Sequence, residues 1–479
     1  MSQPSHRLAI HWFRRDLRLS DNTALWHAST ASQAVLPVYV VSDWQGAHHW
    51  TGPGRQHFLC GCLESLSRNL STLDSRLVIR QGDPVAALEM LIRESRADAV
   101  YFNRDPDPHG RATEERVRRL CRSLGIAVHD YKDAVLHEPG EVLTGAGDPY
   151  RVYTPYSRAW FTQAKAGILG RPKQLGTAPE VASDPLPTLD HWRLSLPGDL
   201  TLPPAGERAA HDRLKAALAG PVLRYAEQRN DPAADATSHL GPDLRYGTIS
   251  VREVFHRAQQ ALDGSRTAAE RESIHTFQKQ LAWREFFMAV LGHFPHVLDA
   301  DFNQQWRHLE WEDPARSDAF DRWREGRTGF PIVDAGMRQL LATGYMHNRV
   351  RMIVAMFLTK DLHLHWRLGE AHFMRHLLDG EIANNNGGWQ WSAGTGADAA
   401  PYFRIQNPWT QSQRHDPTGT YVKRWVPELA RCPATAFFSP PAGTRPIAAD
   451  YPLPMVDHGE ERERTLERFA RAKEAAAAS

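Results

Sequence analysis

Three short stretches in the second half of this 479-residue chain combine aromatic, amide and charged side chains. They are Gln280–Phe287 (QLAWREFF), Tyr345–Met352 (YMHNRVRM) and Asp379–Trp391 (DGEIANNNGGWQW). Taken singly, each has an ordinary structural explanation, because a tryptophan on an apolar helix face is usually core and Asn-Gly-Gly usually marks a turn. Together they are hard to explain by packing alone, and they indicate a ligand site.

The third stretch suggests what that ligand is. The run Asn384–Gly388 has little side-chain volume, so its backbone can approach a flat partner closely. Two indoles, Trp389 and Trp391, follow at once, and Arg351 and Asp379 offer a charged pair. A flavin needs a charged pair at its pyrimidine edge, an amide near N5 and close backbone contact. The pattern therefore favours a flavin that the protein places and tunes.

The segments that carry these residues are predicted to be helices. Apolar residues recur at helical spacing in Ile274–Leu291, Val333–Leu341, Arg349–Leu358 and Gly369–Leu378. We expect the chain to be helical from about Glu207 onward. The tail after about Asp457 is charged and alanine-rich with no evident partner face, which predicts a solvated helix or a frayed end.

The first 130 residues alternate short apolar runs with amphipathic segments. Such alternation is typical of an open, doubly wound, mostly parallel α/β sheet. A Gly-x-Gly-x-x-Gly motif does not follow the first run, so a plain dinucleotide-binding fingerprint is not indicated. The predicted strands are Leu8–Phe13, Val35–Val41, Leu77–Arg80, Ala99–Phe102 and Ala127–Tyr131, and the predicted helices are Gln56–Leu73, Pro84–Ser95 and Arg111–Leu124.

Between these parts lies a stretch rich in proline and glycine, which predicts a long surface connection. Its aromatic residues can anchor it to the body of the protein; they are Tyr150, Tyr153, Tyr156, Trp160 and Phe161. The predicted organisation is an α/β domain at 1–134, a connector at 135–205 and an all-α domain at 206–479.

Composition sets broad limits on function. The chain has 57 Lys+Arg and 56 Asp+Glu, so net charge gives no global attraction to nucleic acid, and positive charge would have to gather on one face. The four cysteines form no zinc-like or disulfide-like array, and no metal site is predicted. Neither a signal peptide nor a bilayer-length apolar window is evident, which predicts a soluble, cytoplasmic protein.

Three longer motifs carry a resemblance to a known family. They are Trp12–Asn22 (WFRRDLRLSDN), Gly326–Ala335 (GRTGFPIVDA) and Gly394–Arg404 (GTGADAAPYFR). In this order the chain resembles the photolyase/cryptochrome family over nearly its whole length, and most of all the class I cyclobutane-dimer photolyases. The resemblance implies a light-driven DNA repair enzyme. In that reaction an excited, reduced FAD donates an electron to a cyclobutane pyrimidine dimer, the ring opens, and the electron returns.

The resemblance also implies which residues hold a U-shaped FAD in the helical domain. Asn385 would face flavin N5, where its amide can accept from N5–H or, flipped, donate to an unprotonated N5. Two positions depart from the family: Gly241 stands where serine is frequent, and Glu381 replaces an aspartate. The residues carried over by position are Tyr225, Thr237, Ser238, Leu240, Arg284, Asn348, Arg351, Asp379, Glu381 and Asn385.

The dimer itself would be flipped out of the duplex into an aromatic pocket. By resemblance, Trp283 and Trp391 form its walls and Met352 fills it, since flipped bases stack well on indoles. Arg349 and Arg404 would hold the neighbouring phosphates.

Gln280 is the main departure at this pocket. Class I photolyases usually have glutamate here, and glutamine is familiar from the (6-4) photolyases. A glutamine can donate to a thymine carbonyl but cannot relay a proton. The (6-4) enzymes carry histidines where this chain has Asn348 and Met352, so cyclobutane dimers remain the favoured substrate.

Two further functions follow from the resemblance. Trp389, Trp366 and Trp311 match an electron relay that runs from the flavin to the surface. Arg55 and Asp105 resemble positions that bind a light-harvesting antenna, although an exposed arginine and a loop aspartate are common for solubility alone. The antenna could be 8-hydroxy-5-deazaflavin, FMN or FAD, methenyltetrahydrofolate, or none.

The partner implied is UV-damaged DNA, single- or double-stranded, bound by a monomer in a bacterial cytosol. Three alternatives stay open at this point: a cryptochrome-type blue-light receptor without repair activity, a (6-4) photolyase, and a non-enzymatic α/β protein with a helical interaction domain.

Overall fold

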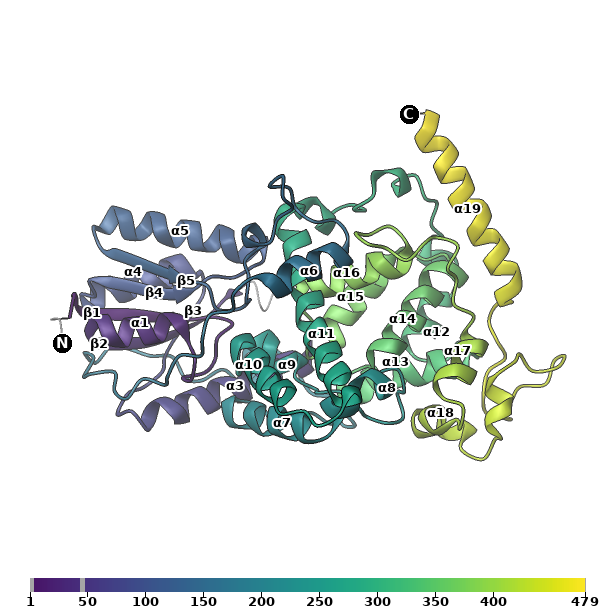
Figure 1. Ribbon diagram of the computed structural model, residues 1–479, viewed down its shortest axis with the longest axis horizontal. Coiled ribbons are helices and arrows are strands. Elements are labelled where there is room, and N and C mark those ends of the chain that lie inside the picture. Colours follow the sequence, from purple (N-terminus) through teal and green to yellow (C-terminus); the bar gives the residue numbers. More distant parts are fainter. Residues whose placement is uncertain (1–3, 44–47, 479) are drawn as a thin grey trace.

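The computed structural model describes residues 4–43 and 48–478, with a parallel sheet at one end and a helical body at the other (Figure 1). The strands are β1 (His6–Phe13), β2 (Ser32–Val41), β3 (Val78–Gln81), β4 (Ala99–Asn103) and β5 (Ala127–Tyr131). They are ordered β3-β2-β1-β4-β5, and each neighbouring pair is parallel. The predicted fold class is confirmed, and each predicted strand overlaps an observed one.

Helices cover both faces of this sheet. Helices α1 (Thr23–Ala31) and α3 (Pro53–Ser71) share a core with Ala9 of β1, whereas α4 (Pro84–Ser95) and α5 (Pro108–Leu124) share one with Leu8 and Ile10. Because successive strand residues point to opposite faces, this division makes the sheet doubly wound. Helix α1, which is short and capped by Asn22, is not among the predicted helices.

The connector is not a loose tether. Its helix α6 (Tyr153–Thr162) buries Trp160 completely, and the indole Nε1 donates to Glu285 Oε2 at 2.7 Å. The same buried carboxylate accepts from the backbone N–H groups of Leu136 and His137. The predicted aromatic anchoring is therefore present, while the domain boundaries 1–134, 135–205 and 206–479 stay a prediction.

The C-terminal half is helical, as predicted. Helix α14 continues into a π-helical turn at Phe357–Asp361. None of the helices in the described ranges 4–43 and 48–478 is long and apolar enough to cross a membrane. The helices are α7 (Glu207–Ala219), α8 (Tyr225–Gln228), α9 (Gly241–Tyr246), α10 (Val251–Asp263), α11 (Ala268–His293), α12 (Ala319–Arg324), α13 (Pro331–Thr343), α14 (Asn348–Met356), α15 (Trp366–His376), α16 (Ile382–Ala393), α17 (Pro408–His415), α18 (Thr420–Trp425) and α19 (His458–Ala478).

The Asn-Gly-Gly segment is not a turn, contrary to its usual meaning. It lies inside α16, whose N-terminus is capped by Glu381 accepting from the backbone N–H of Asn384 at 2.9 Å. A methyl group on Gly387 would lie 2.1 Å from the ring of Phe287, so only glycine lets α16 pack this closely on α11. Tertiary contact therefore overrides the local preference for a turn.

The prediction that the C-terminal tail lacks a partner face was wrong. Helix α19 buries Phe469 against Trp306 and Tyr402, and its His458 pairs with buried Asp361 at 2.5 Å. The partner residues lie about 65 to 165 positions earlier in the chain, so no local pattern could reveal them.

A buried charge network ties the sheet domain to the helical domain. Asp133, just after β5, accepts from Arg18 at 2.7 Å and from Arg252 of α10 at 3.0 Å. Burial alone would raise the pKa of Asp133, but the two guanidinium groups outweigh it and lower that pKa from 3.8 to about 2. The carboxylate is therefore stabilised in the folded protein.

We expect Asp133→Asn to lower the free energy of unfolding by about 3–5 kcal/mol at pH 7, because buried Arg18 loses its carboxylate partner and buried Arg252 loses one of its two. The pKa of this carboxyl group is lower in the folded protein than in the unfolded chain. Its contribution to stability is therefore complete above the unfolded-state pKa and is lost as the pH falls toward the folded-state pKa. The difference in free energy of unfolding between the wild type and the variant should therefore decrease by about 2 kcal/mol as the pH is lowered from 4 to 2. Urea unfolding measures the loss of stability at pH 7 and its decrease at low pH. The control is Asp130→Asn on half-buried β5, which should change the free energy of unfolding by about 1 kcal/mol. Equal losses at both aspartates would contradict this role.

Candidate functional site

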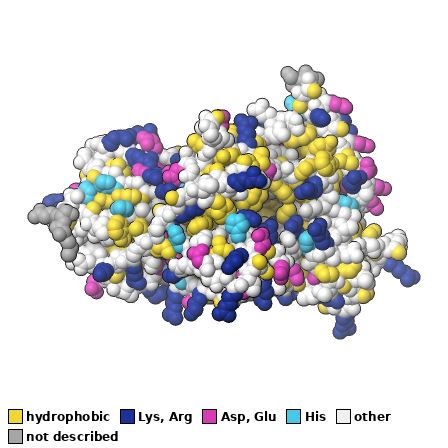
Figure 2. Space-filling view, viewed as in Figure 1, with side chains coloured by type: hydrophobic (Ala, Val, Ile, Leu, Met, Phe, Trp, Pro, Cys, Tyr) yellow, Lys and Arg dark blue, Asp and Glu magenta, His cyan; other side chains and the backbone are white. Residues whose placement is uncertain are grey.

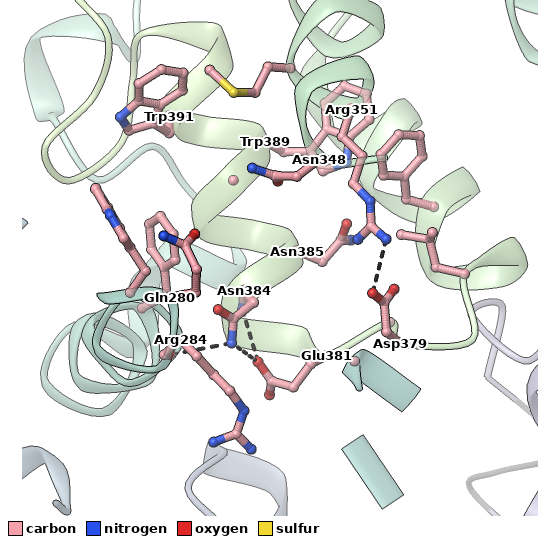
Figure 3. A pocket seen from close by; sticks show the side chains of 18 of the residues that line it. Gln280, Arg284, Asn348, Arg351, Asp379, Glu381, Asn384, Asn385, Trp389 and Trp391 are labelled. Atoms are coloured by element: carbon pink, nitrogen blue, oxygen red, sulfur yellow. Dashed lines mark hydrogen bonds and ion pairs between the residues drawn. The ribbon is translucent and has the colours of Figure 1, made fainter. Parts of the chain in front are cut away.

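A cavity of about 440 Å³ opens between α11, α14, α15, α16 and the segment that follows α15 (Figure 3). That volume lies within the roughly 300–1,000 Å³ common for ligand pockets. On the molecular surface, hydrophobic side chains gather in a hollow over these helices, with Lys and Arg side chains around it (Figure 2). The sequence-predicted residues that line the cavity are Gln280, Trp283, Arg284, Asn348, Arg349, Arg351, Met352, Asp379, Glu381, Asn385, Trp389 and Trp391.

Three helices turn one face each toward the cavity. In each helix four of the lining residues follow the spacing i, i+3, i+4, i+7, which places them on one side over two turns, while Arg349, Asn384 and Trp391 line the cavity from beside these faces. They are Gln280, Trp283, Arg284 and Phe287 on α11; Asn348, Arg351, Met352 and Ala355 on α14; and Asn385, Gly388, Trp389 and Ser392 on α16.

The orientation of Asn385 is fixed by α15. Its Nδ2 donates to the backbone carbonyl of Glu370 at 3.0 Å. This bond leaves Oδ1 as the free end of the amide, and the residue lines the cavity. Of the two orientations that the sequence left open, the structure has the one that presents an acceptor.

Arg351 and Asp379 form a charged pair on the wall. Arg351 Nη2 lies 2.9 Å from Asp379 Oδ2, and Arg351 Nε donates to the carbonyl of Met346 at 2.8 Å. Asp379 Oδ1 is buried and has no hydrogen-bond partner in the described part of the chain. A Cβ atom at Gly241 would lie 2.7 Å from Asp379 Oδ2, which explains why glycine is tolerated where a serine would crowd the carboxylate. The pair therefore offers an unused acceptor beside a cation.

Two more charged residues complete the polar end. Glu381 Oε2 accepts from Asn384 Nδ2 at 2.7 Å, and Glu381 Oε1 lies 3.6 Å from Arg15 Nη2. Burial alone would raise the pKa of Glu381, but Arg15 and the Asn384 hydrogen bonds outweigh it and lower that pKa. Burial lowers the pKa of Arg284 to about 10, so this guanidinium remains charged at neutral pH.

The wall of α16 is open enough for a flat ring. A methyl group at Gly388 would meet no atom of another element within 4 Å among the described residues. The free acceptors at Asn385 and Asp379 and the cation of Arg351 match the N–H groups and carbonyls along the edge of a reduced isoalloxazine ring. The residues present therefore fit a flavin.

Four residues expected to hold the rest of FAD do not line this cavity. Thr237 Oγ1 lies 3.1 Å from the Tyr345 hydroxyl, and Ser238 Oγ accepts from the backbone of Leu240 at 3.4 Å. The Leu240 side chain is buried in the core, and its carbonyl accepts from the backbone N–H of Leu244 at 2.9 Å. Tyr225 packs edge-on against Phe277. Their assignment to FAD stays a prediction.

The mouth of the cavity is aromatic. Trp283 stacks on Tyr153 of the connector, with ring centroids 3.6 Å apart and planes within 9°, so one indole face is covered by protein. Gln280 Nε2 donates to the backbone carbonyl of Thr276 at 3.1 Å, which occupies one of its two N–H groups. Trp391 lies on α16, across from Gln280 (Figure 3).

Arginines stand beside this mouth. Arg349 lines it, with Nη2 held by Asn230 Oδ1 at 2.8 Å. Burial lowers the pKa of Arg349, and nearby Arg229 and Arg414 lower it further. Arg404 is exposed and does not line the cavity. The arrangement can hold anionic groups next to the aromatic walls.

Several lining residues were missed by sequence reasoning. Phe287, Ala355 and Ser392 could have been found by extending the i, i+3, i+4 spacing of the cavity-facing residues by one turn in each helix. Arg229, Leu244 and Arg245 gave no signal, because they come from other parts of the chain.

The three tryptophans of the predicted relay follow one another in space from the cavity to the surface, in the order Trp389, Trp366 and Trp311. Trp389 lines the cavity and packs against Gly369, one turn after buried Trp366 on α15. Half-buried Trp311 contacts the ring of His365 at 5.0 Å, and His365 lies 5.4 Å from Trp366. Their order is thus compatible with a relay.

The two predicted antenna residues do not themselves line the cavity. An arginine at this position suggested an exposed group, but Arg55 is not one. Its Nη1 donates to the carbonyl of Gly380 at 3.3 Å, and burial lowers its pKa to about 10. Asp105 pairs with Arg15 at 2.9 Å and is largely buried. Both have partners within the chain, and their antenna role stays a prediction.

Comparison with known proteins gives concordant matches. A family model for the FAD binding domain of DNA photolyase matches residues 277–471, and one for DNA photolyase matches residues 9–179. The deoxyribodipyrimidine photo-lyase of a Synechococcus species is 40% identical over 94% of this chain and 93% of that protein.

Solved structures agree with these matches. A crystal structure of a bacterial class III photolyase from Agrobacterium tumefaciens has a TM-score of 0.89 and 39% identity, covering 99% of each chain. A crystal structure of an archaeal photolyase from Sulfolobus tokodaii, described with two FAD molecules, has a TM-score of 0.82 and 30% identity, covering 97% of this chain and 100% of that one.

Proposed function

The chain belongs to the DNA photolyase family, and we propose that it is a deoxyribodipyrimidine photolyase that uses light to split cyclobutane pyrimidine dimers in DNA. Its helical domain binds FAD. The observation that carries the proposal is the single cavity in which one wall fits a flavin and the mouth is lined by indoles. When bound and reduced, FAD supplies on excitation the electron that opens the cyclobutane ring.

The residues of the cavity hold that cofactor in place. Arg351 and Asp379 bind the polar edge of the ring, and Asn385 Oδ1 accepts from the N–H that N5 carries in the reduced state. Because Gly388 has no side chain, the ring can lie against the backbone of α16.

The mouth receives the lesion. Trp283 and Trp391 stack on a flipped-out dimer, whose distorted pairing makes extrusion from the duplex less costly. Gln280 donates its free N–H to a dimer carbonyl, and Met352 closes the pocket against water. Arg349 and Arg229 bind phosphates beside it.

A light-versus-dark assay on defined lesions tests the function. The purified protein, loaded with FAD and reduced, is mixed with oligonucleotides that carry either a cyclobutane thymine dimer or a (6-4) photoproduct. We expect the cyclobutane dimer to disappear in blue light and to persist in the dark, with the (6-4) lesion unchanged. Loss of the (6-4) lesion, or no light-dependent loss of either, would refute the assignment.

The tryptophan relay yields a separate prediction. Trp311→Phe should largely abolish light-driven reduction of bound oxidised FAD, because phenylalanine is much harder to oxidise than tryptophan. Chemically reduced Trp311→Phe should repair dimers at the wild-type rate, since the relay is bypassed. Absorbance of the flavin during illumination measures the first quantity, and dimer loss measures the second. If both are lost together, Trp311 is not a relay residue.

The remaining assignments are parts of the same proposal. The DNA is single- or double-stranded, the enzyme acts as a monomer in the cytosol, and any antenna binds near Arg55 and Asp105. Both antenna residues lie in the sheet domain, and Arg55 contacts the Gly380 carbonyl at the cavity wall, which is a short path to the flavin site.

A further inference from the structure

Trp366, the middle tryptophan of the proposed relay, is bonded to a buried carboxyl group. Its indole Nε1 donates to Asp301 Oδ1 at 2.8 Å, and both side chains are buried. An indole has a single N–H, so this bond commits the transferable proton of the ring to Asp301. In the described part of the chain, neither Trp389 nor Trp311 donates to a carboxylate. The middle position therefore differs chemically from the two ends.

The segment that carries Asp301 is anchored to the C-terminal part of α16 and the turn after it. The backbone N–H of Phe302 donates to the side-chain oxygen of buried Gln390 at 2.8 Å. The backbone N–H of Asn303 donates to the carbonyl of Thr395 at 2.9 Å. Asp301 is therefore held on the indole by the same helix that lines the cavity.

The surroundings of Trp366 disfavour a positive charge on its ring. The guanidinium of Arg367 lies over this ring, with Cζ 5.5 Å from the ring centroid, and its Nη2 donates to the carbonyl of Leu298 at 2.6 Å. Loss of an electron would make the ring a second cation beside the first, and like charges repel. A proton shift from the oxidised ring to the carboxylate would remove this repulsion.

The carboxyl group is suited to receive that proton. Burial raises the pKa of Asp301, although the hydrogen bond from Trp366 and the nearby guanidinium groups of Arg367 and Arg307 act in the opposite direction. Burial thus favours the uncharged carboxylic acid, which is the product of the shift.

We propose that Asp301 is the base that takes the indole proton of Trp366 when light oxidises the relay. Oxidised Trp389 withdraws one electron from Trp366, and the Nε1–H proton moves to Asp301 Oδ1. The products are a neutral tryptophan radical and a carboxylic acid. Trp311 then gives one electron to Trp366 and becomes the oxidised member, while the carboxylic acid returns the proton.

The shift makes Trp366 easier to oxidise, since the positive charge that its ring would carry is removed. The oxidised site therefore moves away from the cavity and lasts long enough to be refilled by Trp311. The inference rests on the photolyase function and the relay proposed above, and it gives the middle tryptophan a role that the two ends do not share.

Flash photolysis of Trp311→Phe loaded with oxidised FAD tests the step, because the oxidised site then stops at Trp366. At pH 8 we expect the spectrum of a tryptophan radical cation to be replaced by that of the neutral radical. In the double variant Trp311→Phe, Asp301→Asn, the amide oxygen still accepts from the indole but cannot take its proton. Its spectrum should remain that of the cation, and the radical should decay about tenfold faster, a difference of about 1.4 kcal/mol in the barrier.

Asp299→Asn is the matched control. It removes the same charge from the same segment, but the Asp299 side chain is 92% exposed and lies 3.9 Å from Arg367. Added to Trp311→Phe, this substitution should change neither the spectrum nor the lifetime of the radical.

A second measurement needs no substitution at Asp301. Time-resolved infrared spectra of Trp311→Phe should show the carbonyl band of a carboxylic acid as the neutral radical forms, and this conversion should be slower in D₂O than in H₂O. Absence of that band would overturn the proposal, as would a neutral radical that forms equally fast with asparagine at position 301. Absence of any tryptophan radical would overturn it by refuting the relay. Dimer repair by chemically reduced wild type bypasses the relay, so its failure would instead refute the proposed function.

Discussion

Gly388→Leu should abolish FAD binding and leave the protein folded. The Gly388 position faces the cavity, and a methyl group there would meet no neighbouring element within 4 Å among the described residues. The added isobutyl group therefore points into the space that the flavin ring requires, and it disturbs no packed contact. A ring cannot lie against the helix backbone once that backbone carries a branched side chain.

The absorption spectrum of the purified variant, incubated with excess FAD, measures this loss, and thermal unfolding of the apoprotein measures the fold. The adjacent glycine gives a matched control. Gly387→Ala should destabilise the protein by about 1–3 kcal/mol, because its methyl group would lie 2.1 Å from the Phe287 ring. Gly388→Leu therefore tests whether the flavin occupies the cavity, whereas Gly387→Ala tests the packing of α16 on α11. A Gly388→Leu protein that retains one FAD per chain would show that the flavin lies elsewhere.

Trp391→Ala should weaken binding of dimer-containing DNA by about 10- to 100-fold, since stacking of a base on an aromatic ring contributes roughly 1–3 kcal/mol. FAD content should stay unchanged, because the contacts that fit the flavin edge come from Arg351, Asp379 and Asn385. Fluorescence anisotropy with labelled oligonucleotides, with and without a dimer, measures the change.

The variant's affinity for undamaged DNA should change little, because Trp391 acts on the extruded bases. Trp26→Ala in α1 of the sheet domain serves as the control, and it should bind the dimer as the wild type does. Unchanged dimer affinity in Trp391→Ala would place the lesion outside this cavity.

The sequence predicted best where local pattern and tertiary structure agree. The strands of the sheet are short apolar runs between amphipathic helices, and α4 and α5 start at Asp-Pro and, for α5, end at Gly125 in a left-handed conformation. Helices α11 and α14 also carry regular apolar stripes. Most of their cavity-facing residues were predicted because the resemblance to the family carries them over by position, and the helical spacing explains why they share one face.

The sequence predicted less where distant residues decide the outcome. Helix α16 contains Asn-Gly-Gly, and it is held as a helix by the cap at Glu381 and by contact with Phe287. The partner of α19 lies far away in the chain, and Arg229 reaches the cavity from a different segment. Such contacts depend on the assembled fold, which local spacing does not encode.

The stripes on α11, α14 and α16 have a consequence for sequence change. An α-helix advances about 100° per residue, so inserting or deleting one residue before a stripe would swing every following member about 100° around the helix axis. Point substitutions elsewhere in these helices leave the cavity-facing residues in line. In contrast, the insertion or deletion of one residue in any of the three helices would turn part of those residues away from the cavity. We therefore expect length variation among functional variants of this protein to be confined to the connector and the surface loops.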